Sequence, residues 1–181
     1  QARATLLRWR DDPVAFVREV FRIEPDAWQA EALAAFPHHE RIALKACKGP
    51  GKTCLLAWFI WNFLTTRYHP QVAATSITED NLNDGLWPEL STWQQRSPML
   101  LDQFAWTKTR IFCRAAPSTW FASARTWSRN ADAQRQSATL SGIHAPHVMF
   151  VCDESGDYPR AIMATAEAVL ATGEETKLVQ A

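Results

Sequence analysis

One stretch constrains this chain more than any other: residues 46–53 read Ala-Cys-Lys-Gly-Pro-Gly-Lys-Thr. Residues 41–46, just before it, alternate like a strand, and residues 53–66, just after it, carry apolar side chains at helical spacing. A Gly-rich turn between a strand and a helix N-terminus presents backbone N–H groups to an anion. The stretch is therefore expected to hold the phosphates of a nucleoside triphosphate.

Each residue of this phosphate loop, the Walker A motif, has an expected role. Lys52 contacts the β- and γ-phosphates, and the Thr53 hydroxyl binds Mg²⁺. The remaining residues supply backbone groups and shape to the nucleotide site; they are Ala46, Cys47, Lys48, Gly49, Pro50 and Gly51. A Gly-Pro-Gly turn that precedes Lys-Thr by accident is the alternative, and a second motif argues against it.

The second motif is a short apolar run, residues 147–152, that ends in Asp153 and Glu154. Such a run is typical of a buried parallel strand whose C-terminal tip faces a ligand, and it fits the Walker B pattern. Asp153 would hold the Mg²⁺ shell through water, and Glu154 would orient and deprotonate the water that attacks the γ-phosphate. A strand followed by an acidic turn is the alternative, but the phosphate loop upstream favours the catalytic interpretation.

Composition bounds the class of protein. With 181 residues, of which 47% are hydrophobic, the chain can bury one sizeable core and is most simply a single domain. The formal net charge is zero, so no global field indicates nucleic acid or a membrane. The four cysteines lack metal-ligand spacing, and no apolar run has membrane-spanning length. We therefore expect a soluble protein with reduced thiols in a cytosolic compartment.

Two helices are expected ahead of the phosphate loop. Pro13, after an aspartate, predicts one over about 13–22, and a second covers about 26–36. Gln29 in the second helix has two interpretations. It forms a capping box with Asp26, or its amide reads adenine by pairing with N7 and the N6 amino group. Both interpretations stay open on local grounds.

After the loop, helices and strands alternate, which predicts a doubly wound α/β P-loop NTPase with a mostly parallel sheet flanked by helices. The Asp-Glu ending of the second motif indicates the additional-strand, catalytic-glutamate branch of this fold. Polar residues 125–145 predict a loop or short helix on the nucleotide side of the sheet. The expected elements are strand 71–76, helix 78–95, strands 104–106, 111–113 and 119–124, helix 159–170 and strand 176–181.

Basic residues outnumber acidic ones between residues 103 and 137. A basic face with aromatics suits a phosphate backbone or a neighbouring subunit's nucleotide, and a solvated surface whose tryptophans are core is the open alternative. Phosphoryl transfer also needs a positive charge beyond the loop lysine. Arg125 is the candidate for this arginine finger in trans, with Arg129 and Arg135 as alternatives. The stretch contains Lys108, Arg110, Arg114, Arg125, Arg129 and Arg135, with Trp106, Trp120 and Trp127 interleaved.

In the order of these motifs the chain resembles the N-terminal ATPase domain of the large terminase subunit, the motor that packages DNA into tailed-phage heads. The resemblance covers about residues 10–181. It rests on residues 28–29, 46–53, 142–145 and 147–156. The family often has Arg where this chain has Lys48, and a Lys keeps the charge but loses the planar fork that would sense the γ-phosphate.

The resemblance implies hydrolysis of ATP, with Mg²⁺, to power translocation of double-stranded DNA into a phage capsid without sequence specificity. It implies a portal and a small terminase subunit as partners, a homo-oligomeric ring when working, no membrane, and the host cytoplasm as the location of a phage or prophage protein. Residues 1–181 would form one ATPase domain in which helices within residues 1–36 precede the P-loop core. The family's C-terminal nuclease domain is absent from this chain.

Two other functions stay open. A superfamily 2 helicase-like ATPase also has a Gln motif and an Asp-Glu pair, although nothing here continues into the helicase Asp-Glu-Ala-Asp/His form. A nucleotide-gated docking module with little turnover would use the same pocket. Unwinding of a forked duplex would favour the first, and a turnover assay tests the second.

Overall fold

The structure is a computed structural model that describes residues 1–45, 49, 51–76, 78–126, 142–158, 160–170 and 173–181. It contains a seven-stranded sheet with the strand order β1-β7-β6-β2-β5-β4-β3. The strands are β1 (Arg41–Ala43), β2 (Gln71–Ser76), β3 (Phe104–Trp106), β4 (Arg110–Cys113), β5 (Phe121–Arg125), β6 (His147–Asp153) and β7 (Glu175–Gln180).

The sheet is mostly parallel, as predicted. β1, β7, β6, β2 and β5 run parallel, and β4 and β3 return antiparallel at the far edge. β7 lies between β1, which leads into the phosphate loop, and β6, which ends at Asp153. This inserted strand is the arrangement of the additional-strand branch, so the predicted fold class is confirmed.

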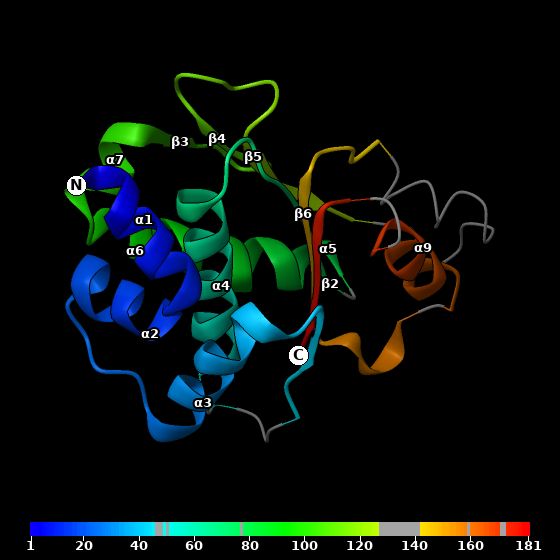
Figure 1. The fold of residues 1–181 in the computed structure, drawn as a ribbon. Coiled ribbons are helices and arrows are strands. Elements are labelled where there is room, and N and C mark those ends of the chain that lie inside the picture. Colours follow the sequence, from blue (N-terminus) through cyan, green and yellow to red (C-terminus); the bar gives the residue numbers. More distant parts are fainter. Residues whose placement is uncertain (46–48, 50, 77, 127–141, 159, 171–172) are drawn as a thin grey trace.

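Helices cover both faces of the sheet, with α1, α4 and α6 on one side and α9 on the other (Figure 1). Every residue of α4 from Leu55 to Thr66 is buried, so this helix lies inside the larger core. The α-helices are α1 (Ala2–Asp11), α2 (Pro13–Phe16), α3 (Ala27–Ala35), α4 (Lys52–Thr66), α5 (Glu79–Asn81), α6 (Trp87–Gln95), α7 (Pro98–Gln103) and α9 (Arg160–Leu170). π-helical η1 (Val17–Phe21) and η3 (Leu82–Leu86) and 3₁₀-helical η2 (Phe36–His38) and η4 (Ser155–Asp157) complete them.

Side chains of β6 alternate between the two faces of the sheet. Met149 and Val151 pack in the larger core with α4, whereas Phe150 and Cys152 pack in a smaller cluster on the α9 side. Because a strand has a period of two residues, Asp153 continues the Met149–Val151 face. The pattern of apolar residues in β6 therefore directs this carboxylate toward the side on which α4 begins.

Two predicted helix starts are confirmed by their caps. The Asp12 carboxylate accepts a hydrogen bond from the Ala15 backbone N–H at 3.0 Å, and the Thr78 hydroxyl accepts one from the Asn81 N–H at 3.0 Å. The predicted helix 78–95 is a continuous run of α5, η3 and α6.

Two helices were not predicted, α1 and α7. α1 contains no buried residue. α7 is only six residues long and begins after Ser97, whose side chain accepts from the Leu100 backbone N–H. In the described part of the chain, no helix is both long and apolar enough to cross a membrane.

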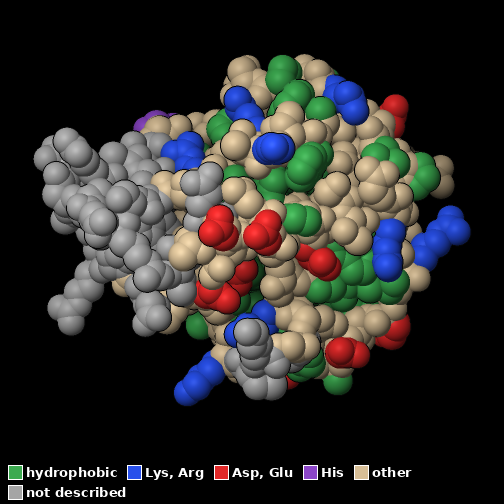
Figure 2. Space-filling model, turned by 180° about the vertical axis from the view of Figure 1, so that it is seen from behind, with side chains coloured by type: hydrophobic (Ala, Val, Ile, Leu, Met, Phe, Trp, Pro, Cys, Tyr) green, Lys and Arg blue, Asp and Glu red, His purple; other side chains and the backbone are tan. Residues whose placement is uncertain are grey.

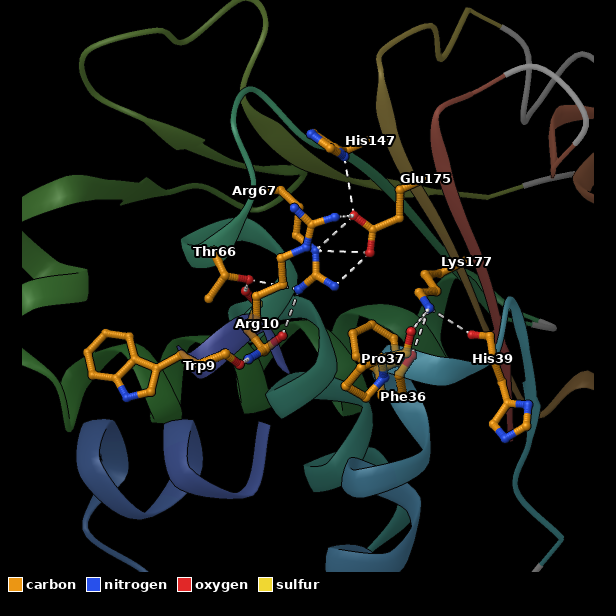
Figure 3. Close-up of polar contacts among 11 residues, drawn as sticks. Trp9, Arg10, Phe36, Pro37, His39, Thr66, Arg67, His147, Glu175 and Lys177 are labelled. Atoms are coloured by element: carbon orange, nitrogen blue, oxygen red, sulfur yellow. Dashed lines mark hydrogen bonds and ion pairs between the residues drawn. The ribbon is translucent and has the colours of Figure 1, made fainter. Parts of the chain in front are cut away.

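A buried ion-pair cluster fastens the edge of the sheet at which the parallel strands begin (Figure 3). The Arg67 side chain, 1% exposed, donates to Glu175 Oε1 at 2.7 Å, and Arg10 from α1 reaches Glu175 Oε2 at 2.9 Å. His147 Nδ1 lies 3.3 Å from the same carboxylate. Because His147 and Glu175 are paired in register, the cluster fixes how β6 and β7 align.

Lys177 extends this fastening toward the N-terminal helices. Its ammonium donates to the backbone carbonyls of Phe36, Pro37 and His39 at 2.7, 3.2 and 2.8 Å (Figure 3). These are the carbonyls that lie between α3 and β1, where a chain without such a donor would leave acceptors unpaired. The cluster thus connects β7 to the strand that leads into the phosphate loop.

Candidate nucleotide site

A cavity of about 600 Å³ lies at the opposite edge, where the parallel strands end. Its lining joins the two predicted motifs, which are a hundred residues apart in sequence. Acidic side chains gather near the middle of the face shown in Figure 2, with basic side chains just below them. The lining residues are Gly49, Gly51, Lys52, Thr53, Cys54, Glu89, Asp153 and Glu154.

The phosphate loop has the backbone that its glycines predict. Gly49 and Gly51 have φ angles of 93° and 89°, in the left-handed region that favours glycine. Gly51 also lies against Gln29, because a Cβ at this position would be 2.9 Å from Gln29 Nε2. Lys52 and Thr53 follow at once in the first turn of α4, whose N–H groups and dipole favour an anion.

Asp153 ends β6 and is 7% exposed. Burial raises the pKa of Asp153, the negative charge of Glu154 raises it further, and the charge of Lys52 opposes them. A buried carboxylate of this kind is stabilised in its ionised form by a cation. Ser76, its partner in register, has a buried hydroxyl with no hydrogen-bond partner among the described residues.

The donor chemistry of this cavity fits Mg²⁺. The Thr53 hydroxyl and the Asp153 carboxylate are hard oxygen ligands, which Mg²⁺ prefers. Within the described residues, no three His, Cys, Asp or Glu side chains come together closely enough to hold an ion by themselves.

Glu154 turns out of the strand into the cavity. Its φ of 56° and ψ of 45° are left-handed, so the chain changes direction directly after Asp153. The side chain is exposed, and its Oε2 accepts a hydrogen bond from the Asn81 amide at the end of α5. An exposed carboxylate that is held from one side can hydrogen-bond a water in the cavity.

Gln29 forms the predicted capping-box contact. Its side-chain oxygen accepts from the Asp26 backbone N–H at 3.0 Å, and its amide nitrogen donates to the Gly51 carbonyl at 3.4 Å. The side chain is 5% exposed. Gln29 therefore connects the start of α3 to the phosphate loop, and its role as an adenine reader stays a prediction.

Arg125 lies at the same edge of the sheet as the cavity, at the end of β5. It pairs in register with Thr75 of β2, which in turn pairs with Cys152, so one strand separates β5 from β6. Its Nε donates to Ser123 Oγ at 3.1 Å. Burial lowers the pKa of Arg125, and the charge of Arg110 lowers it further. The predicted residues Ala46, Cys47, Lys48, Pro50, Trp127, Arg129 and Arg135 lie outside the described residues.

Two tryptophans of the basic stretch pack against the core. The Trp120 indole donates to the Leu64 carbonyl at 2.8 Å, and the Trp106 indole donates to the Trp87 carbonyl at 3.3 Å. Their ring faces therefore serve packing, which favours the core alternative for these two residues. The Arg110 guanidinium lies 3.9 Å from the centroid of the Phe121 ring, a cation–π contact.

Comparison with known proteins gives structural but no sequence matches. No protein-family model matches the sequence, and no curated protein matches it. The HK97 bacteriophage large terminase superposes with a TM-score of 0.70 at 14% identity, over 95% of this chain and 37% of that chain. The ATPase domain of the Thermus phage P74-26 large terminase superposes with a TM-score of 0.69 at 16% identity, over 94% of this chain and 69% of that chain. The chain has the fold of a large terminase ATPase domain.

Three residues that sequence analysis missed complete the site in this terminase ATPase fold. Glu89 lines the cavity from α6, and Asn81 donates to Glu154 from α5. The Tyr158 hydroxyl contacts the carbonyls of Thr75 and Asp153 at 2.7 and 2.9 Å, which holds the tips of β2 and β6 together. None of the three belongs to a local motif, since tertiary packing alone brings them to the cavity.

Proposed function

We propose that this chain is the ATPase domain of a large terminase subunit and that it hydrolyses ATP to move double-stranded DNA into a phage capsid. The observation that carries the proposal is the joining of the phosphate loop and the Asp153–Glu154 pair in one cavity. It is supported by a fold shared with two phage terminases. The chain spans 37% of the length of the HK97 terminase, so the packaging activity of a whole large terminase is part of the proposal.

The chemistry follows from the positions of these side chains. Lys52 and the N–H groups at the start of α4 bind the β- and γ-phosphates. Thr53 and, through water, Asp153 would hold Mg²⁺, which neutralises charge on the transferred phosphoryl group when bound. Glu154 accepts a proton from the attacking water and orients it toward the γ-phosphate.

A charge-neutral substitution separates binding from chemistry. Glu154→Gln should bind ATP nearly as the wild type does, because Lys52 and the loop supply the binding contacts. It should lose hydrolysis by on the order of 100-fold or more, since only the carboxylate accepts the proton. Lys52→Ala should lose both. Substantial hydrolysis by a clean preparation of Glu154→Gln would contradict the assignment of Glu154.

The proposal includes an arginine that acts on the nucleotide of a neighbouring subunit. A positive charge supplied in this way contributes on the order of 10³-fold or more to phosphoryl transfer. Arg125 is our candidate, because it lies at the nucleotide edge of the sheet; Arg129 and Arg135 are the alternatives. We therefore expect weak ATP hydrolysis that rises with protein concentration.

Mixing two inactive subunits tests donation in trans. Glu154→Gln keeps its arginines, and Arg125→Ala keeps its Glu154, so the mixture should recover activity that neither subunit has alone. In the control, Arg114→Ala takes the place of Arg125→Ala, because Arg114 lies near the opposite edge of the sheet. If no change at Arg125, Arg129 or Arg135 lowers turnover, or if specific activity does not vary with concentration, the finger lies elsewhere or acts in cis.

The partners and location in the proposal are those of a packaging motor. Double-stranded DNA would be gripped without sequence specificity, and a portal and a small terminase subunit would dock the motor, which works as a homo-oligomeric ring in the host cytoplasm. Stimulation of ATP hydrolysis by duplex DNA, without unwinding of a forked duplex, is the expected result. Unwinding would point instead to a helicase-like enzyme.

A further inference from the structure

A third carboxylate, Glu89, lines the cavity together with Asp153 and Glu154. It lies in the first turn of α6, is half-buried, and belongs to neither nucleotide motif. A negative charge beside a phosphate loop repels a triphosphate unless a cation lies between them. We therefore expect Glu89 to have a role in this cavity that differs from the roles of the two motifs.

The Glu89 side chain is held from behind by the core. The Trp93 indole N–H, one helical turn along α6, donates to Glu89 Oε1 at 2.7 Å. Trp93 is 6% exposed, and its ring packs edge-on against Trp58 of α4, with centroids 5.2 Å apart. An ionised carboxylate has acceptor sites beyond this one hydrogen bond, so Glu89 keeps acceptor capacity for a ligand.

Glu89 faces the start of α4 across the cavity. The lining contains Glu89 from α6 together with Thr53 and Cys54 from the first turn of α4. The carboxylate therefore borders the same cavity as the Thr53 hydroxyl.

We propose that Glu89 is an outer carboxylate of the metal site, which accepts a hydrogen bond from a water molecule bound to Mg²⁺. The proposal rests on the proposed function, because it requires Mg²⁺ and a triphosphate in this cavity. It is supported by the position of Glu89 in the cavity lining and by the Trp93 indole that holds its carboxylate. Mg²⁺ usually keeps several waters, and groups that orient such outer ligands stabilise the site.

The test is the gain in nucleotide affinity that Mg²⁺ gives, measured by calorimetry with a non-hydrolysable ATP analogue in Mg²⁺ and in EDTA. Glu89→Gln keeps an oxygen for the Trp93 indole and removes only the charge. It should lower the Mg²⁺-dependent gain roughly tenfold and leave the affinity in EDTA unchanged or slightly tighter. Glu167→Gln, on the exposed side of α9, is the matched control and should change neither value.

A second variant separates charge from shape. Glu89→Asp keeps the charge on a shorter side chain and should retain more of the Mg²⁺-dependent gain than Glu89→Gln. If the wild type shows the gain and Glu89→Gln shows it undiminished, or if Glu89→Gln weakens binding equally in Mg²⁺ and EDTA, the inference is overturned and the proposed function stands. If the wild type binds no nucleotide, the proposed function fails and the inference falls with it.

Discussion

The two edges of the parallel sheet use charge in opposite ways. Where the strands begin, Glu175 forms ion pairs with Arg67 and Arg10, so its negative charge is neutralised within the protein. Where the strands end, Asp153 is buried beside the like charge of Glu154, and its pKa is raised. The charges at the first edge are paired within the protein, whereas the carboxylates at the second edge are stabilised only when a cation and phosphates bind.

The direction of the pKa shifts shows the same difference. Burial alone would raise the pKa of Glu175, but the hydrogen bonds and charge of Arg67, helped by Arg10 and Lys177, bring it below its ordinary value. For Asp153, burial and the charge of Glu154 raise the pKa, and the Glu154 backbone N–H and the charge of Lys52 only partly oppose them. The charge of Glu175, where the strands begin, therefore stabilises the fold. The charge of Asp153, where they end, destabilises the ligand-free fold.

Breaking the buried cluster should have the largest effect. Arg67→Met leaves the half-enclosed Glu175 without its main partner, so we expect a loss of about 3–5 kcal/mol in the free energy of unfolding. Arg18→Met is the matched control: it breaks the Arg18–Glu24 pair, whose side chains are 52% and 68% exposed, and should lower stability far less than Arg67→Met does. Urea unfolding measures both, and equal losses would contradict the comparison.

The Gln29 contact to the phosphate loop should give a smaller loss. Because its side-chain oxygen caps α3 and its nitrogen reaches Gly51, we expect Gln29→Ala to lower stability by about 1 kcal/mol. Affinities for ATP and GTP should fall together if the contact is structural. A selective loss of ATP affinity with an unchanged melting temperature would instead support the adenine interpretation.

The acid dependence of stability sharpens the comparison at Glu175. Its folded-state pKa is lowered, so the stability that it contributes is present above its ordinary value of 4.5 and is lost as the pH falls through the lower folded value. The stability difference between the wild type and Glu175→Gln should therefore shrink between pH 7 and strongly acidic pH. A difference that stays constant with pH would show that ionised Glu175 is not what stabilises this edge.

Removing the charge at the other edge should have the smallest effect on stability, with the opposite sign. The raised pKa means that ionised Asp153 disfavours the nucleotide-free fold at neutral pH, so Asp153→Asn should raise the melting temperature, on the order of 2 °C. The same change should remove the Mg²⁺-dependent gain in nucleotide affinity. A fall in melting temperature would mean that Asp153 is already satisfied without a ligand.

The cavity edge could be predicted because the residues that line it belong largely to two contiguous motifs. Each motif predicts a local structure and a ligand: the first is a glycine turn before Lys52 and Thr53, and the second is an apolar run before Asp153. The edge at which the strands begin could not be predicted this way. Arg67 and Glu175 are 108 residues apart, and only the pairing of β6 with β7 brings them together.

The difference between local and distant contacts also explains which other elements and residues sequence analysis predicted and which it missed. Residues 71–76 were predicted as a strand and form β2, because their β propensity and flanking breaks agree with the fold. The packing of α1 depends on contacts far away, such as the Asn62 amide that donates to the Trp9 carbonyl at 2.8 Å. Glu89 was missed for a related reason: its place in the cavity is set by how α6 packs on α4.

Hydrogen exchange with and without a non-hydrolysable ATP analogue and Mg²⁺ tests the central contrast most directly. The amides of residues 51–55 and 153–155 should exchange more slowly when both ligands are present, because they line or support the phosphate cavity. The amides of residues 175–178 should keep the same rate, since that edge is complete without a ligand. Protection confined to residues 175–178, or no protection at the loop and the end of β6, would contradict the account.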